Sequence, residues 1–393
     1  MLQKMSLSRR RAVRPTLDFL EERSLLNAAL PRMDHGLRTT AEVRDATSRS
    51  PIVPNLPSTP DAKLTTVPAS GDVNPYGVAL VPAGFPRGGL LKPGQILVAN
   101  FNNNSTSFQG TGTTIVAITP GQNPSTAPTF FTSQSTGLNA ALGVLKSGFV
   151  IVGNTPTTDG TFGTIGQGSL QIINRLGHVV QTLSDPNLLD GPWGSTLIDH
   201  GSTAQLYVSN VLNGTVTRIN LKVVTHHGST SVNVASMTQI GSGFAWQGND
   251  AALVVGPTGL AYNAKTDTLY VAATDNNAIF AIPHASHTHA DKGTGTLIYQ
   301  DPAHLFGPLG LALAPNGDLL ATNGDAVNNS NEMASQTSAL TEFTPTGMFV
   351  GQISLDSGAG AAFGLVVYTH GHSLTVASVD DVTNTLDFRT ITA

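Results

Sequence analysis

Apolar residues from about residue 63 onward occur in short runs rich in Val, Ile and Leu, and clusters of Gly, Pro, Asn and Asp separate these runs. Runs of this kind, bounded by turn-forming residues, are typical of antiparallel β-strands. One pattern recurs: a glycine opens a short apolar strand, a polar turn follows, and two further apolar strands come next. The opening glycines are Gly77, Gly143, Gly194, Gly259, Gly310 and Gly364. The pattern therefore predicts six copies of one antiparallel sheet.

A single sheet of three or four strands cannot bury both of its faces, but six such sheets arranged radially can. We therefore predict an all-β fold, a six-bladed β-propeller over residues 61–393. The repeated glycine fits the start of the innermost strand, because blades crowd the central axis there and a side chain would clash.

The two ends of the propeller are predicted to meet in one blade. The last copy offers only three strands, at about 363–369, 373–379 and 384–391, and a missing outer strand would leave an exposed edge. The segment 63–67, with the sequence KLTTV, precedes the first copy and has no blade of its own. We expect this segment to pair with the last copy and close the ring; the alternative is a lone strand in a linker.

Composition supports this fold class and excludes several functions. Charged residues make up only 11% of the chain, with 41 Gly and 23 Pro, which disfavours a helical protein. Without Cys, the chain can form neither disulfides nor thiolate metal sites. The chain beyond residue 50 is mildly acidic, so the electrostatic footprint of a nucleic-acid-binding protein is missing. No apolar run is long enough for a transmembrane helix.

The first fifty residues differ from the rest, because they hold half of the 20 Lys and Arg. The run RRRAVRPTLDFLEERSLLNA at residues 9–28 resembles an N-terminal motif of large extracellular bacterial proteins. That resemblance implies an export segment at residues 1–30 and an extracellular or cell-surface location. The alternative is an amphipathic surface helix. Residues 31–60 are rich in proline and lack apolar periodicity, so we expect a disordered linker.

Two copies, GPTGLAYNAKTDTLYVAATDNNAIFAI and GPWGSTLIDHGSTAQLYVSNVLNGTVTRINL, resemble NHL-type propeller repeats. The resemblance covers roughly residues 70–393. It departs from the NHL pattern at the end of the second strand, where Asp is replaced; the residues here are Asn100, Asn154, Asn210, Ala273, Asn323 and Ser378. Six-bladed propellers of similar appearance include the gluconolactonase group, in which a divalent cation at the channel mouth activates a lactone.

The topology of a propeller assigns residues to faces. Loops after the second strands and loops that enter the first strands share one face, the top. This face receives the candidate ligand-binding residues Asn100, Asn154, Asn210, Asp275, Asn323, Asp325, Trp193 and Trp246. Amides, carboxylates and aromatic rings around a channel mouth suit polar ligands such as glycans or peptides. The alternative is that the Asn residues only cap turns.

Most histidines fall in loops of the opposite face, the bottom. His284, His287 and His289 are close enough in sequence to bind a transition metal through neutral imidazoles. The alternative is a solvated face that gains positive charge as the pH falls.

Two function classes stay open at this point. The first is an extracellular binding or scaffolding module that holds a protein or glycan through its top-face loops. The second is a divalent-metal-dependent hydrolase of the lactonase type, with Asp275, Asp325 and Asn210 around calcium or another divalent cation. Calcium prefers six to eight oxygen ligands, several of them charged, whereas the repeated top-face position carries mostly amides.

Overall fold

A computed structural model describes residues 50–106, 108–249, 252–324 and 337–392, which all belong to one unit, Ser48–Ala393. The predicted export segment and candidate residue Asp325 lie outside the described residues. The described chain holds no helix with the length and apolarity that a membrane crossing requires.

Six four-stranded antiparallel sheets make up the fold. The innermost strands are β2 (Val73–Leu80), β6 (Leu138–Leu145), β10 (Pro192–Asp199), β16 (Pro257–Asn263), β20 (Leu311–Leu313) and β24 (Ala362–His370). The second strands are β3 (Ile96–Asn102), β7 (Phe149–Asn154), β11 (Thr203–Asn210), β17 (Thr268–Ala273), β21 (Leu319–Asn323) and β25 (Ser373–Asp380).

The third strands are β4 (Thr114–Ile118), β8 (Ser169–Asn174), β12 (Thr215–His226), β18 (Ala278–Pro283), β22 (Ser338–Phe343) and β26 (Thr385–Thr392). The outer strands are β5 (Thr129–Thr132), β9 (Val179–Leu183), β13 (Ser229–Gly241), β19 (Thr296–Tyr299), β23 (Phe349–Asp356) and β1 (Ala62–Thr65). The remaining elements are a hairpin of β14 (Gln247–Asn249) and β15 (Leu253–Val255), and two short 3₁₀ turns, η1 (Val53–Asn55) and η2 (Phe162–Thr164).

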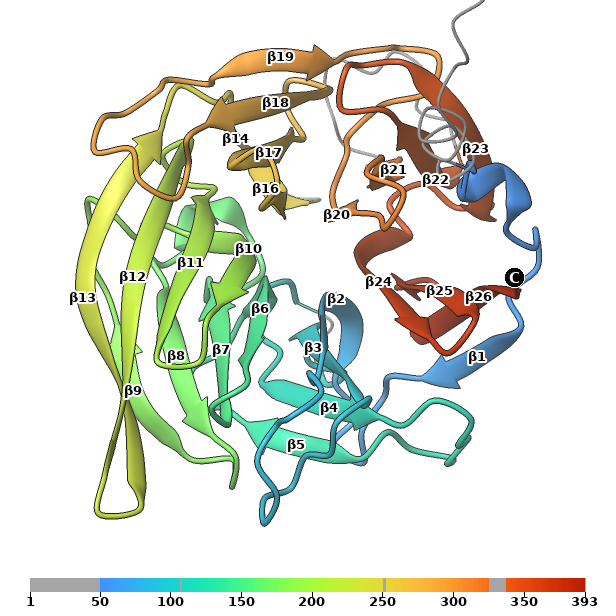
Figure 1. Cartoon of the computed structure of the whole chain (residues 1–393). Helices are drawn as coiled ribbons and strands as arrows, with labels where there is room; N and C mark the ends of the chain where they lie inside the picture. Colours follow the sequence, from blue (N-terminus) through green and yellow to red (C-terminus); the bar gives the residue numbers. More distant parts are fainter. Residues whose placement is uncertain (1–49, 107, 250–251, 325–336, 393) are drawn as a thin grey trace, which may run out of the picture. The chain divides into compact units, whose positions relative to one another are not determined.

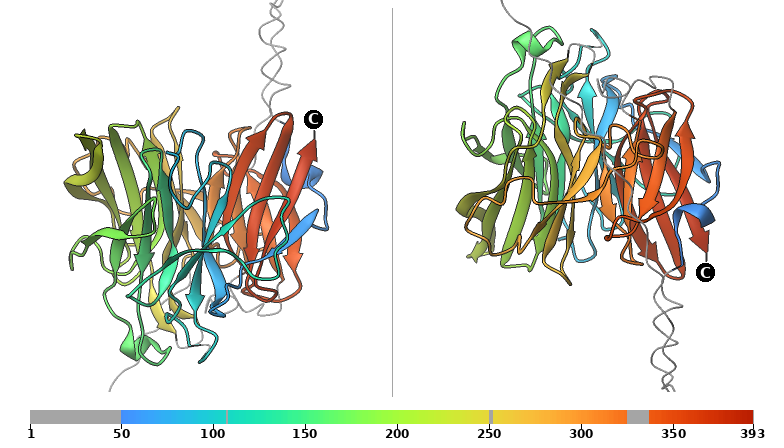
Figure 2. Two further views of the ribbon diagram at one scale, coloured as in Figure 1. Left: turned by 90° about the horizontal axis from the view of Figure 1, so that it is seen from below. Right: turned by 90° about the horizontal axis from the view of Figure 1, so that it is seen from above.

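The sheets are arranged radially as blades 1 to 6, in the chain order of their innermost strands. Each innermost strand contacts that of the next blade, from β2 through β6, β10, β16 and β20 to β24 and back to β2 (Figure 1). In side view, the strands run between the two faces and the loops gather on those faces (Figure 2). The predicted six-bladed β-propeller is confirmed.

Blade 6 closes the ring as predicted, because its outer strand is β1. β1 pairs antiparallel with β26, with Leu64 opposite Leu386. The Val67 carbonyl accepts a hydrogen bond from the Ala127 N–H of blade 1. Lys63 forms ion pairs with Asp387 at 2.9 Å and Asp380 at 3.5 Å. The two ends of the propeller are thus joined by backbone pairing and by charge.

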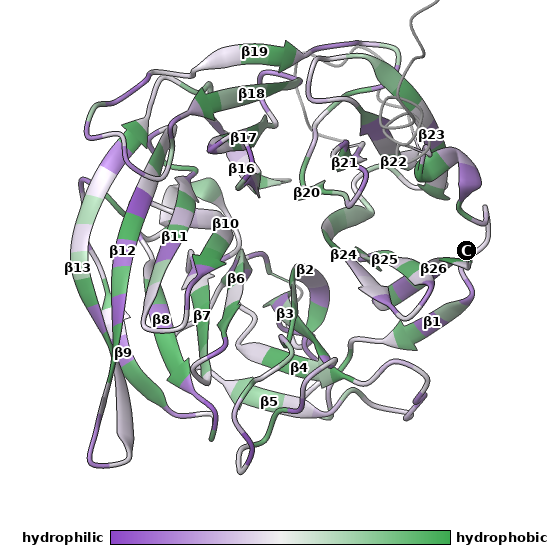
Figure 3. Cartoon of the chain, in the orientation of Figure 1, coloured by the Kyte–Doolittle hydropathy of each residue, from purple (hydrophilic) through white to green (hydrophobic). Residues whose placement is uncertain are grey.

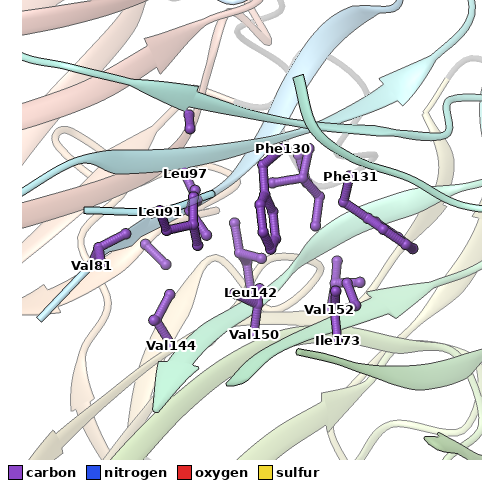
Figure 4. Close-up of a cluster of buried hydrophobic side chains, with 14 of the residues drawn as sticks. Val81, Leu91, Leu97, Phe130, Phe131, Leu142, Val144, Val150, Val152 and Ile173 are labelled. Atoms are coloured by element: carbon purple, nitrogen blue, oxygen red, sulfur yellow. The ribbon is translucent and has the colours of Figure 1, made fainter. Parts of the chain in front are cut away.

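The core lies between neighbouring blades. Between blades 1 and 2, apolar side chains from both sheets form one buried cluster that includes Leu97, Phe130, Leu142 and Val152 (Figure 4). Apolar residues are concentrated in the strands, and polar residues occupy many of the turns (Figure 3). Because each inner strand packs on a blade at either side, β3 and β7 are buried along their whole length.

Close approach between blades explains five of the six repeated glycines. A Cβ on Gly194 would lie 2.0 Å from the Thr258 carbonyl oxygen of blade 4, and one on Gly364 would lie 2.2 Å from the Tyr76 oxygen of blade 1. Gly143 is the exception. A Cβ there would meet only the Leu197 side chain, because the bulge of blade 2 spans more residues and places Gly143 opposite Ile151.

The strand register corrects the repeat alignment in blade 6. Ala362 pairs with Asp380, just as Pro192 pairs with Asn210 in blade 3. The residue equivalent to Asn210 is therefore Asp380 and not Ser378, which lies two residues before the end of β25. In the last blade, the Asp of the NHL pattern at the end of the second strand is therefore present, as Asp380.

The described part of the predicted linker, residues 50–60, packs on blade 5. Ile52 and Val53 are buried, and their N–H groups donate to the buried Glu342 carboxylate at 2.8 and 2.7 Å. The chain then passes to blade 6 and forms β1. Residues 50–60 therefore form part of the propeller.

Candidate functional site

The four predicted Asn residues at the ends of second strands are buried and perform the same structural task. Each side-chain amide donates to a backbone carbonyl in the segment that enters its own blade from the preceding one. Asn100, Asn154, Asn210 and Asn323 donate to Thr66, Thr136, Leu188 and His304, at 3.0, 3.2, 3.1 and 2.8 Å. These amides fix the crossovers between blades. Their predicted role in ligand binding stays a prediction.

A cavity of about 200 Å³ opens at the top face, above the central channel. We call it the mouth cavity. Its walls come from the starts of first strands, the ends of second strands and the loops beside them. The main lining residues are Asn74, Tyr76, Trp193, Val254, Val255, Thr258, Thr274, Leu309, Phe363 and Asp381. The cavity therefore belongs to the face that the topology assigned to ligand binding.

Aromatic rings build much of this cavity. The rings of Tyr76 and Phe363 stack with centroids 3.9 Å apart, and Trp193 meets Tyr76 edge-on at 5.9 Å. Phe101 supports both Tyr76 and Trp193 from behind, at 4.8 and 5.3 Å. These four residues come from blades 1, 3 and 6. Trp193 lines the mouth cavity from within β10 and not from the loop before that strand, and it is almost fully buried.

Asp381 is the carboxyl group of the mouth cavity, and its pKa is unusual. It directly follows β25, and its N–H donates to the Ala361 carbonyl at 2.9 Å. Burial raises the pKa of Asp381, and the negative charges of Asp380 and Asp356 raise it further, to about 7. A carboxyl whose charge is disfavoured in this way gains from a ligand group that donates a hydrogen bond to its ionised form or accepts one from its protonated form.

Asn74 and two threonines also border the cavity. Asn74 has a positive φ of 60°, and its buried Oδ1 has no hydrogen-bond partner among the described residues. Thr258 and Thr274 hydrogen-bond to each other through their hydroxyls at 2.9 Å, and both contact the Pro308 carbonyl. The hydrogen bonds of the two threonines hold this part of the cavity wall together.

The predicted cation ligands are not brought into one described cluster. The Asn210 amide is occupied by Leu188, Thr215 and Thr217, whereas Asp275 accepts a hydrogen bond from Gln247 of β14. Asp325 lies outside the described residues. Trp246 precedes β14 and is 41% exposed. Among the described lining residues of the mouth cavity, Asp381 is the one carboxylate, which does not fit the several charged oxygens that calcium prefers.

On the bottom face, the structure brings His284 and His287 together with Asp267. Their ligand atoms all lie within 4.8 Å of one another, the only such group of three in the described chain. His289 is not part of this group. Burial raises the pKa of Asp267, but hydrogen bonds from Ser286 and Tyr262 outweigh that effect, so it lies below its ordinary value.

Sequence reasoning missed Asp381, Asn74 and Asp267. Asp381 directly follows the end of β25, one position before the equivalents of Asp275 and Asp325, but the alignment ended the second strand of this repeat at Ser378 and left Asp381 unassigned. Asp267 lies in the turn between β16 and β17. Loops after first and third strands share the bottom face, so the same topological rule that placed the histidines could have found it.

No protein-family model matches the sequence, and neither does any curated protein sequence. The fold is similar to several solved structures. A luciferin-regenerating enzyme has a TM-score of 0.47 and 8% identity, covering 84% of this chain and 95% of that one. A gluconolactonase from Xanthomonas campestris has a TM-score of 0.47 and 13% identity, covering 86% and 97%. A calcium-binding regucalcin from Agrobacterium tumefaciens has a TM-score of 0.47 and 10% identity, covering 84% and 94%. Likeness at this level does not bear on activity.

Proposed function

We propose that the mouth cavity is the site of a small-molecule hydrolase of the lactonase type, in which Asp381 acts as general base. The observation that supports this most is the pKa of Asp381, raised to about 7 by burial and by its acidic neighbours. A general base works best when its pKa lies near the operating pH. Perturbed carboxyl groups in cavities are typical of functional sites, although structural networks also produce them.

The walls of the cavity favour an uncharged substrate with an apolar or aromatic part. Tyr76, Trp193 and Phe363 present ring surfaces, and aromatic rings contribute large apolar contact areas in such pockets. An uncharged ester or lactone with an apolar or aromatic part satisfies this requirement.

The proposed reaction is the addition of water to the carbonyl carbon of the ester or lactone. In its ionised form, the Asp381 carboxylate accepts a proton from the water as the water oxygen bonds to that carbon. The tetrahedral intermediate then breaks its bond to the alkoxy oxygen, which receives the proton back from Asp381. The products are the acid and the alcohol, joined in one hydroxy acid when the substrate is a lactone.

A cation-dependent version of this chemistry rests on Asp275, Asp325 and Asn210. The described donor set at the mouth does not fit calcium, because Asn210 is occupied and Asp381 is the one lining carboxylate. We therefore assign no step to a cation. Calcium titration followed by thermal melting tests this choice. A chelator-sensitive stabilisation that Asp275→Ala removes would replace our account with the cation-dependent one.

The second candidate is a binding module without turnover, which the aromatic lining also favours.

An extracellular location rests on the motif at residues 9–28, so we propose it on that resemblance alone. Fusing residues 1–60 to a reporter tests it: export of the reporter supports the location, and retention contradicts it.

The direct test of the hydrolase is a panel of uncharged aryl esters and lactones assayed with the purified full chain. We expect kcat/KM to rise with pH through about 7 as Asp381 ionises. Asp381→Asn is expected to lower it by about 100-fold or more. Asp199→Asn, on the opposite face, is the matched control and should retain activity. Saturable binding that needs Asp381 but gives no turnover would contradict the hydrolase and favour the binding module.

A further inference from the structure

The bottom face carries a cluster of metal-ligating side chains that the proposed function does not use. Asp267 lies between β16 and β17, and His284 and His287 lie in the loop after β18. Both loops belong to blade 4. One oxygen of Asp267 lies 2.8 Å from Nδ1 of His287, and the rings of the two histidines are 5.3 Å apart. We propose that these three residues form a binding site for a divalent transition metal ion such as Zn²⁺.

The two carboxylate oxygens of Asp267 have different surroundings. Oδ1 accepts hydrogen bonds from the Tyr262 hydroxyl and the Ser286 N–H, both at 2.8 Å. Oδ2 is buried and has no hydrogen-bond partner among the described residues, although it lies at ion-pair distance from His287. A ligating carboxylate is commonly oriented in this way, with one oxygen held by donors and the other left for the metal.

The loop that carries the histidines is held by side chains of blade 3 and by a backbone hydrogen bond within the loop. The buried Arg218 of blade 3 donates from Nη1 to the Ala285 carbonyl at 2.7 Å, and Gln205 donates to the Ser286 carbonyl at 2.8 Å. Within the loop, the Thr288 N–H donates to the His284 carbonyl at 2.9 Å. These bonds supply the fixed spacing that a metal site needs and that the sequence pattern of the histidines does not show.

The chemistry of the donor set selects the class of metal. Two imidazoles and one carboxylate suit Zn²⁺, Ni²⁺ or Cu²⁺, whereas Ca²⁺ and Mg²⁺ prefer oxygen ligands. Three protein ligands leave one position of a tetrahedral zinc ion for water. Both histidines are exposed, so an ion can enter from solvent.

The test is a Zn²⁺ titration of the untagged full chain by calorimetry, with Co²⁺ absorption as a second readout of coordination. We expect one tight site per chain. His284→Ala, His287→Ala and Asp267→Asn should each weaken Zn²⁺ binding at least 10-fold, and His289→Ala should not change it. A double His226→Ala, His227→Ala variant controls for loose binding by other bottom-face histidines.

Folding is checked by melting each variant in the presence of a chelator, and His287→Gln replaces His287→Ala if that variant does not fold. Equal Zn²⁺ binding by wild type and the three ligand variants would overturn the proposal. Loss of binding in His289→Ala alone would also overturn it. Neither outcome depends on hydrolysis, so this test is independent of the proposed function.

Discussion

The top and bottom faces of this propeller each present a partly buried carboxyl group, and the pKa values of the two groups are shifted in opposite directions. Asp381 lies in an aromatic cavity near two other carboxylates, which raises its pKa to about 7. Asp267 is also desolvated, but Tyr262 and Ser286 donate to it and its pKa is lowered. The comparison teaches that burial alone does not decide the charge of a carboxyl: the donors around it do.

The largest expected effect is on the rate of hydrolysis, which should depend on Asp381 of the top face and not on Asp267 of the bottom face. Asp381→Asn should lower ester or lactone hydrolysis by about 100-fold or more, because the amide cannot accept the proton from water. Asp267→Asn should leave hydrolysis within about two-fold, because it lies on the other face. Steady-state rates of both variants measure this difference. Equal losses in the two variants would break the comparison.

The second effect is on Zn²⁺ binding, which should depend on Asp267 and not on Asp381. Asp267→Asn should weaken Zn²⁺ binding by about 10- to 100-fold, and Asp381→Asn should leave it unchanged. Calorimetry on both variants provides the comparison. If Asp381→Asn removed zinc binding, the metal would belong to the mouth cavity and not to the bottom cluster.

The third effect is on stability and has opposite signs at the two faces. The folded pKa of Asp381 lies above its unfolded value, so the free energy of unfolding falls as the pH rises from about 4 to about 7. Asp381→Asn removes this loss, and the variant should be more stable than wild type at pH 8 by up to about 4 kcal/mol, the free energy of a shift of about three pKa units. The two proteins should converge near pH 4.

Asp267 should show the reverse. Its lowered pKa contributes stability above its unfolded pKa, and this contribution is lost as the pH falls through the folded value. Asp267→Asn should therefore be less stable than wild type at pH 8 and approach it in acid. Denaturant unfolding across this pH range measures both variants. Curves of the same sign would contradict the account of the two environments.

The smallest effect sharpens the description of the bottom cluster. Tyr262→Phe removes one hydrogen bond to Asp267 Oδ1 and leaves Ser286 in place. We expect about a 10-fold weaker Zn²⁺ affinity, because the carboxylate is less well oriented. Tyr299→Phe, in the outer strand of the same blade, is the matched control and should bind zinc as wild type does.

Much of the fold follows from the sequence because its determinants are local and repeated. Apolar alternation predicts the strands, and glycines such as Gly194 mark the close approach of neighbouring blades. The repeated asparagines carry a signal as well, since each fixes the segment that enters its blade. The pairing of β1 with β26 follows from a missing strand in the last repeat.

The site was less predictable because its chemistry depends on residues far apart in the chain. The raised pKa of Asp381 comes from its burial at the mouth cavity and from Asp356 and Asp380. The repeat alignment placed the equivalent of Asn210 two residues before Asp380, and no local pattern indicates the observed register. Likewise, His287 was recognised as a possible ligand, but its partner Asp267 is joined to it only by the topology of blade 4.

The most direct test of the central claim is a titration of the Asp381 carboxyl, followed by carbon-detected nuclear magnetic resonance of the full chain. Asp381→Asn identifies the signal, because the variant lacks it. The account predicts an apparent pKa near 7 that falls when Asp356→Asn removes a neighbouring charge. An apparent pKa near 4, the value of an ordinary aspartate, would contradict the proposed general base and the assignment of the mouth cavity as the functional site.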